Sequence, residues 1–285
     1  MSKFILSGFG DEIADGLNEQ LRVMADEGFG AIELRGVDGR SIATYTPDEA
    51  RSLKRTLEAA GFEVSAIGSP IGKYDITEPL APQLELTQRM VEVAQVLDAR
   101  YIRLFSFFMP EGRADQYRDE VLRRMRALKA VAHGSGVMLL HENEADIYGD
   151  SAARCVDLMR ELCDEDFQLI FDASNFVQVG EADVWAAWEL LREHVVYLHI
   201  KDSVRPQAKR EGRDMGFQGV SDSHRLVGDG EGRVRDILCD LRARGFEGYL
   251  SLEPHLTNCE LVPGDAPAKW RAAAMALKGM IAGLG

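Results

Sequence analysis

Four stretches in the second half of the chain share one pattern: LLHENE at residues 139–144, LIFDASN at 169–175, YLHIKD at 197–202 and LSLEPH at 250–255. Each begins with apolar and aromatic residues that favour a buried β-strand, and each ends in acidic or histidine side chains. In parallel α/β folds, functional residues gather at the carboxyl ends of the strands. These stretches therefore predict a fold class and also the edge of that fold where chemistry takes place.

The same unit, a short apolar strand followed by a polar loop and an amphipathic helix, recurs along all 285 residues. One predicted helix, Pro47–Ala60, has Thr46 and Glu49 placed for an N-terminal capping box. Eight such units predict an α/β fold, a (β/α)8 TIM barrel, as a single domain over residues 1–285. The predicted strands are Phe4–Phe9, Ala31–Arg35, Val64–Gly68, Tyr101–Phe107, Val137–Glu142, Gln168–Asp172, Val195–Lys201 and Tyr249–Glu253.

A longer connection, roughly Ser203–Gly232, separates the last two predicted strands. Glycine, arginine, aspartate and serine replace the apolar periodicity there, so we expect a long loop after the seventh strand that lies over the active face. The alternative architecture is a doubly wound open sheet. It lacks its nucleotide-binding fingerprint, because Gly8-Phe9-Gly10 is followed by Ile13 where G-x-G-x-x-G requires glycine.

Composition excludes several classes of partner. The formal net charge of −14 argues against a nucleic-acid-binding surface, and no apolar stretch is long enough to cross a membrane. The amino terminus does not resemble a secretory signal, and the four cysteines form no C-x-x-C pair. We therefore expect reduced thiols and a cytoplasmic protein.

The four strand ends carry a set of metal ligands. If the strands surround one barrel, the side chains of Glu142, Asp172, His199 and Glu253 converge on its axis. Three carboxylates that lie together repel one another, and a divalent cation removes that repulsion. Oxygen donors with one nitrogen favour Mn²⁺, with Mg²⁺, Co²⁺ or Zn²⁺ as alternatives. The competing interpretation is that these acids cap the amino termini of neighbouring helices.

Strand alternation predicts which other polar residues face the same interior. Glu144 shares a face with Glu142, Lys201 with His199, and His255 with Glu253. We expect Glu144, His255 and Asn175 to contact a substrate. On the second and fourth strands, charged residues interrupt apolar runs, and they form either ion pairs inside the barrel or contacts with a substrate. These residues are Glu33, Arg35 and Arg103.

The chain resembles the xylose-isomerase-like TIM barrel superfamily of sugar and sugar-phosphate isomerases, epimerases and inosose dehydratases. The resemblance implies the same four metal ligands, a small sugar-like substrate and a homodimer or homotetramer. In ketose 3-epimerases of this superfamily an arginine six residues after the histidine ligand contacts the sugar, and Arg205 matches it; Asn175 stands where those enzymes have a histidine. The motifs that carry the resemblance are His141-Glu142-Asn143, Phe171-Asp172, His199-Ile200-Lys201-Asp202, GDGEG at 228–232 and Leu252-Glu253-Pro254-His255.

These residues predict a metal-dependent isomerase or epimerase of a ketose or related sugar. Glu142 and Glu253 remove and return a proton next to a metal-bound carbonyl, and Lys201 stabilises the resulting enediolate. Loss of a β-hydroxyl from the same enediolate gives the first alternative, a lyase or dehydratase acting on a keto-inositol or keto-sugar. A second alternative is a sugar-binding protein without catalytic activity.

Overall fold

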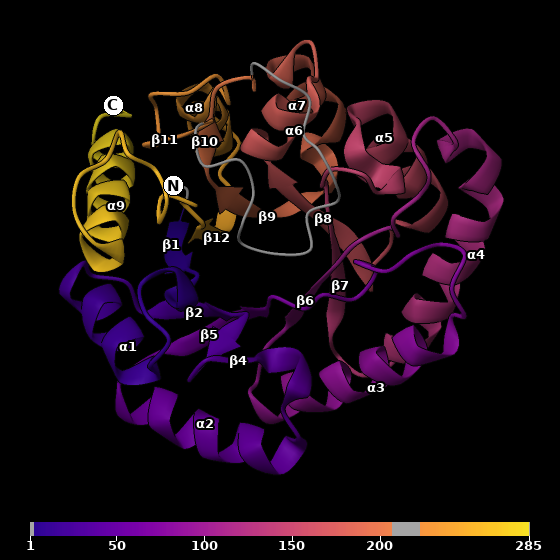
Figure 1. Cartoon of the computed structure of the whole chain (residues 1–285), viewed down its shortest axis with the longest axis horizontal. Coiled ribbons are helices and arrows are strands. Elements are labelled where there is room, and N and C mark those ends of the chain that lie inside the picture. Colours follow the sequence, from indigo (N-terminus) through magenta and orange to yellow (C-terminus); the bar gives the residue numbers. More distant parts are fainter. Residues whose placement is uncertain (1–2, 207–222, 285) are drawn as a thin grey trace.

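Eight parallel strands form a ring at the centre of the computed structural model, which describes residues 3–206 and 223–284 (Figure 1). The strands follow one another in the order β1-β12-β9-β8-β7-β6-β5-β2. An isolated parallel bridge between Phe9 and Glu33 joins the two ends of this order, so the ring is nearly closed. The predicted (β/α)8 barrel is confirmed. Its strands are β1 (Lys3–Gly8), β2 (Ala31–Leu34), β5 (Glu63–Ile67), β6 (Tyr101–Leu104), β7 (Met138–Glu142), β8 (Phe167–Asp172), β9 (Val195–Ile200) and β12 (Glu247–Leu252).

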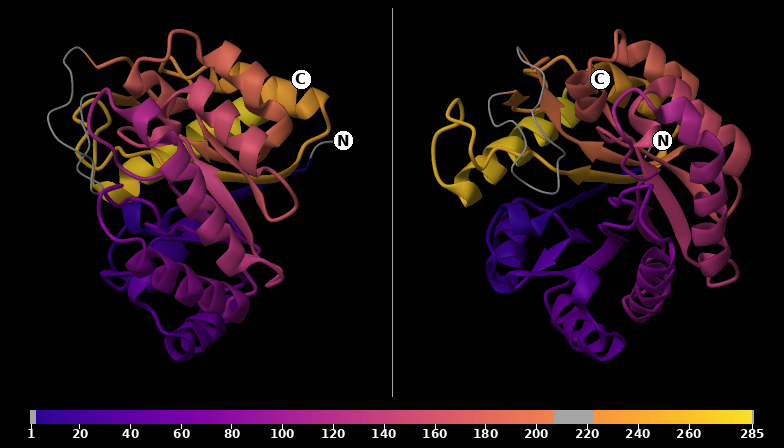
Figure 2. Two further views of the ribbon diagram at one scale, coloured as in Figure 1. Left: turned by 90° about the vertical axis from the view of Figure 1, so that its right-hand side faces the viewer. Right: turned by 45° about the vertical axis from the view of Figure 1, so that its right-hand side comes forward.

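Helices cover the outside of the ring, as Figures 1 and 2 show. Their apolar faces pack on the strands and form the main core. The capping box predicted for α2 is present, since Thr46 Oγ1 accepts from the backbone N–H of Glu49 and Glu49 Oε2 accepts from that of Thr46. No helix in residues 3–206 and 223–284 is long and apolar enough to cross a membrane. The α-helices are α1 (Leu17–Asp26), α2 (Pro47–Ala59), α3 (Ala81–Val96), α4 (Ala114–Ala132), α5 (Ala152–Leu162), α6 (Ala173–Val179), α7 (Val184–Leu191), α8 (Val234–Ala243) and α9 (Ala266–Ala282).

Short elements follow several strands. One prediction is corrected here, because β6 ends at Leu104 instead of continuing to Phe107, where the backbone adopts a positive φ of 68°. The short strands are β3 (Gly36–Val37), β4 (Arg40–Ser41), β10 (Asp202–Ser203) and β11 (His224–Arg225), and the 3₁₀ helices are η1 (Gly10–Glu12), η2 (Ile42–Thr44), η3 (Tyr148–Asp150) and η4 (Arg192–His194).

The interior of the barrel is closed below the active face by a small apolar cluster, which consists of Ala66, Leu140, Ile170 and Tyr197. The Tyr197 hydroxyl lies 2.9 Å from the Ser65 hydroxyl, which lies 2.6 Å from that of Ser7. Because side chains fill this level of the barrel, the open space remains at the carboxyl ends of the strands.

The glycine-rich run GDGEG at 228–232 wraps around the carboxylate of Asp202. The backbone N–H groups of Gly228, Gly230 and Gly232 donate to its two oxygens over 2.9–3.1 Å. Any side chain at Gly230 would overlap that carboxylate, which explains the glycine there. The run thus ties the start of the long loop after β9 to its end; residues 207–222 of this predicted loop lie outside the described residues.

Candidate active site

The four predicted metal ligands meet at the active face of the barrel. Glu142 and Asp172 are the last residues of β7 and β8, His199 lies near the end of β9, and Glu253 directly follows β12. All four are buried, and one ligand-type atom from each lies within 4.8 Å of the others. The convergence expected from the strand ends is therefore present in the fold.

The His199 imidazole lies between carboxylates on both sides. Its Nδ1 is 2.9 Å from Glu142 Oε1 and 3.6 Å from Glu253 Oε2. Its Nε2 is 3.1 and 3.2 Å from the two oxygens of Glu33, a buried residue of β2. Burial alone would lower the pKa of His199, but the charges of Glu142 and Glu33 raise it well above its usual value.

Lys201 places its ammonium group inside the same cluster. Its Nζ is 2.9 Å from Asp172 Oδ2 and 3.1 Å from Glu253 Oε2. Burial raises the pKa of Asp172 to about 6 although Lys201 acts in the opposite direction. The pKa of Lys201 is raised, because Asp172 and Glu253 outweigh the effect of burial, so the group remains an ammonium ion.

Two arginines approach the cluster from the other side of the barrel. Arg35 Nη1 is 2.6 Å from Glu253 Oε1, and its Nε is 2.9 Å from Asp11. Arg103 Nη1 is 3.2 Å from Glu142 Oε2 and 3.9 Å from Glu253 Oε1. Arg35 and Arg103 therefore form ion pairs inside the barrel. This was one of the two alternatives that the sequence allowed, the other being contacts with a substrate.

These cations determine the charge of the two candidate acid–base glutamates. Burial would raise the pKa of Glu142, but His199 and Arg103 hold it at about 2. Burial would also raise the pKa of Glu253, but nearby cations, of which Lys201 has the largest effect, keep it well below the usual value. Both glutamates are thus ionised and can accept a proton.

The residues present fit a divalent metal. Glu142 Oε2 and Asp172 Oδ2 are buried oxygens that accept no hydrogen bond within the described structure, although Arg103 and Lys201 lie near them. Together with Glu253 and the Nδ1 side of His199, they form a donor set of oxygens and one nitrogen. A second group also has ligand atoms within 4.8 Å of one another, and it consists of Glu12, Glu253 and His255. The Arg35 guanidinium already contacts both of its carboxylates.

A cavity of about 600 Å³ opens above these residues. The candidate catalytic residues Glu142, Lys201 and Glu253 form part of its wall. Of the residues predicted to contact a substrate, four also line it, namely Arg35, Arg103, Glu144 and His255.

The other two predicted substrate contacts lie elsewhere. Asn175 is buried beside Glu142 and donates to its Oε1 over 3.1 Å, so it orients that carboxylate. Arg205 is half exposed, and its guanidinium donates to the backbone carbonyls of Glu181 and Ala182. Arg205 is therefore not brought to the cavity in this structure, because these carbonyls hold its side chain away.

Three further residues belong to the site. Lys73 lines the cavity and pairs with Glu144 at 2.9 Å, and Asp11 and Glu12 both contact Arg35. Asp11 and Glu12 lie just beyond β1, so the strand-end rule applied to the first strand would have found them. Lys73 lies in a loop after β5, and no pattern in the sequence marks it.

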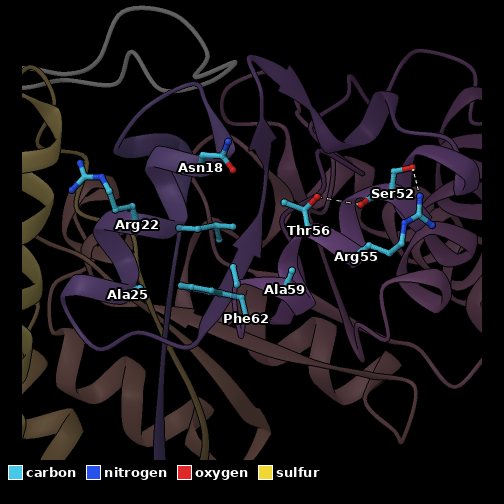
Figure 3. A pocket seen from close by; sticks show the side chains of 10 residues that line it. Asn18, Arg22, Ala25, Ser52, Arg55, Thr56, Ala59 and Phe62 are labelled. Atoms are coloured by element: carbon cyan, nitrogen blue, oxygen red, sulfur yellow. Dashed lines mark hydrogen bonds between the residues drawn. The ribbon is translucent and has the colours of Figure 1, made fainter.

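A second hollow, of about 790 Å³, lies on the outer wall between α1 and α2 (Figure 3). Its lining includes Arg22, Arg55, Thr56 and Phe62, and no acidic side chain or histidine belongs to it. It lacks the groups that bind a metal or transfer a proton, so the cavity at the strand ends is the candidate active site.

The model of one protein family matches residues 21–280, and this family is described as xylose isomerase-like TIM barrel. The chain belongs to this family. No curated protein matches it in sequence. Solved structures related to this xylose isomerase-like barrel are 14–20% identical, and at that level they show the fold alone.

Three of these structures illustrate the range of the fold. The IOLI protein with a bound zinc atom is 14% identical, with 98% of each chain covered and a TM-score of 0.77. The probable 3-DHS dehydratase AsbF from Bacillus anthracis is 16% identical, with 98% of this chain and 99% of that chain covered and a TM-score of 0.74. The 3-keto-D-glucoside 4-epimerase YcjR from E. coli is 16% identical, with the same coverage and a TM-score of 0.68.

Proposed function

We propose that this xylose isomerase-like barrel is a divalent-metal-dependent isomerase or epimerase of a ketose or related sugar. One observation carries the proposal. Glu142 and Glu253 are buried, ionised carboxylates on β7 and just after β12, with β8 and β9 between them, and both line the cavity. Two such groups at one cavity can remove a proton from a bound carbon and return it.

Glu142, Asp172, His199 and Glu253 would hold the metal. When bound, a divalent cation supplies Lewis-acid polarisation of a carbonyl group. The donor set supports Mn²⁺ first, then Mg²⁺ or Co²⁺, and Zn²⁺ is a further candidate, since the IOLI structure of the same fold contains a zinc atom.

The other residues of the chain position and stabilise the reacting groups. Asn175 donates to Glu142 Oε1 and so orients the carboxylate that would accept a proton from the substrate. The Lys201 ammonium can donate to the oxygen on which negative charge develops. A proton returned to the opposite face of the same carbon gives an epimer, and one returned to the neighbouring carbon gives an isomer.

The charges in the cavity favour a substrate without phosphate or carboxylate groups. Each lysine or arginine that lines the described part of the cavity already pairs with a carboxylate of the protein, over 2.6–3.2 Å. With a metal on Glu142, Asp172 and Glu253, Arg35 would still pair with Asp11 and Glu12, and Lys73 with Glu144. An anionic substrate would have to compete with these largely buried carboxylates for the same cations, which is costly. The paired cations are Arg35, Arg40, Lys73, Arg103 and Lys201.

The test is hydrogen exchange in D₂O, followed by ¹H NMR with a panel of keto-sugars and their phosphate esters. We expect deuterium to enter an isomeric product from an uncharged sugar, activity to disappear with a chelator, and Mn²⁺ to restore it. Exchange that persists without metal, or that occurs only with phosphate esters, would contradict the proposal. Tight metal binding without exchange from any sugar would instead identify a sugar-binding protein.

A dehydratase is the second candidate. Loss of a β-hydroxyl can follow the same proton abstraction, and the solved structures that share the fold include the probable 3-DHS dehydratase AsbF. The first proton abstraction is common to both reactions, so the same NMR experiment separates them. Loss of water from the substrate, seen as a new alkene or conjugated enone signal, would replace the isomerase proposal with this one.

A further inference from the structure

Glu33 is buried inside the barrel on a strand that contributes no predicted metal ligand. It lies on β2, which β1 and β12 separate from β9, yet its carboxylate contacts His199 on β9. Only about 1% of its surface is exposed. A buried charge requires a partner, and within the described residues no lysine or arginine lies within ion-pair distance of Glu33.

Two groups hold the Glu33 carboxylate. The Tyr197 hydroxyl donates to Oε2 over 2.8 Å, and His199 Nε2 lies 3.1 Å from the same oxygen. Tyr197 is in turn within 2.9 Å of Ser65, which fixes its hydroxyl from the far side of the barrel. These contacts hold the Glu33 carboxylate at the Nε2 edge of the His199 ring.

The ring of His199 cannot easily turn over. Phe9 packs against it edge-on, with 5.2 Å between the ring centroids and an angle of 76° between the planes. Carboxylates lie on both edges of the ring, so both nitrogens carry hydrogen while the imidazole is charged. With a cation on the Glu142 side, a neutral ring would keep its one hydrogen on Nε2, where Glu33 accepts it. Nδ1, on the opposite edge, is the nitrogen that faces Glu142 and Glu253.

We propose that Glu33 is the positioning residue that fixes the tautomer and orientation of His199, so that Nδ1 offers its lone pair to a divalent cation. This inference rests on the proposed function, since it concerns the same metal site. Carboxylates that accept from the second nitrogen of a histidine ligand raise the basicity of that ligand, and their loss weakens metal binding about 10- to 100-fold. Tyr197 supports the arrangement by holding the Glu33 oxygen in place.

The first test is calorimetric titration of the metal-free protein with Mn²⁺ and Zn²⁺. Glu33→Gln keeps the size of the side chain and removes its charge, and we expect a metal dissociation constant about 10- to 100-fold higher than that of the wild type. The matched control is Glu63→Gln, since Glu63 also accepts from a tyrosine hydroxyl, that of Tyr249, but does not contact His199. Its affinity should equal that of the wild type.

The second test needs no substitution. ¹⁵N NMR of the zinc-loaded wild type should show His199 with hydrogen on Nε2 and the metal on Nδ1, and it decides the question if Glu33→Gln does not fold. The inference is overturned by a zinc-bound Nε2, or by equal metal affinity of Glu33→Gln and wild type. Failure of the wild type to bind any divalent metal would overturn the proposed function as well.

Discussion

The two halves of the barrel mouth contribute different sets of charged groups. The later strands bring the carboxylates of Glu142, Asp172 and Glu253, whereas the earlier strands and loops bring the cations Arg35, Lys73 and Arg103. Ion pairs cross from one half to the other, such as Arg35 to Glu253 at 2.6 Å and Arg103 to Glu142 at 3.2 Å. Glu142 and Glu253 therefore stay ionised, since they have counter-charges both from their own half, His199 and Lys201, and from the earlier half, Arg103 and Arg35.

Removal of an acid from the later half should have the largest effect. Glu142→Gln and Glu253→Gln each keep the side-chain size but cannot accept a proton, so we expect the deuterium exchange rate to fall by about 10²- to 10⁴-fold. Exchange is followed by ¹H NMR under saturating Mn²⁺, so that weaker metal binding does not imitate the loss of a base.

The matched control for these two variants is Glu63→Gln, on β5 and away from the cavity, which should exchange at the wild-type rate. Circular dichroism should show an intact fold for all three proteins. Full exchange by either active-site variant would remove that glutamate from the mechanism.

Lys201 directly follows β9, in the same half as the carboxylates. Its removal tests whether the cations of the earlier half are sufficient for catalysis. Lys201→Met leaves Asp172 and Glu253 without their nearest ammonium group and removes a donor to the developing oxyanion. We expect kcat to fall by about 10²- to 10³-fold. Lys73→Met, at the cavity wall beside Glu144, should change KM more than kcat. A similar kcat for both variants would exclude a special role for Lys201.

The difference between the halves also explains what could be predicted from the sequence. The later ligands end apolar strands at regular positions, so alternation and strand ends were enough to place Glu142 and Asp172 together. The barrel follows from the same repeat of strand and helix. Both depend on local periodicity, which a single sequence contains.

The remaining features depend on contacts between distant segments. The role of Glu33 required knowledge that β2 and β9 face one another across the barrel, which no spacing in the sequence specifies. Arg205 matched a family position, but carbonyls of residues 181 and 182 hold its side chain away from the cavity. The glycines at 228–232 suggested a family motif, and only the fold shows that they enclose Asp202.

Loss of the hydrogen bonds to Asp202 should have a smaller effect than loss of a catalytic group. It tests whether these hydrogen bonds hold the loop of the later half in place. In Asp202→Asn one oxygen becomes an amide group, so two of the backbone N–H groups that now donate to the carboxylate lose their acceptor. We expect the free energy of unfolding in urea to fall by about 1–3 kcal/mol. Asp229→Asn, exposed within the same glycine run, is the control and should unfold as the wild type. Equal stability of the two variants would show that the carboxylate does not hold the loop.

The smallest effect is expected at the outer hollow between α1 and α2, which has no acidic side chain in its described lining (Figure 3). Arg55→Ala enlarges this hollow and removes only a contact with Ser52, so exchange rate and metal affinity should match the wild type. A cluster of buried, ion-paired side chains identifies a reactive site better than the size of a hollow does. A loss of exchange as large as that of Lys201→Met would reverse this conclusion, because it would connect the reaction to the outer wall of the barrel.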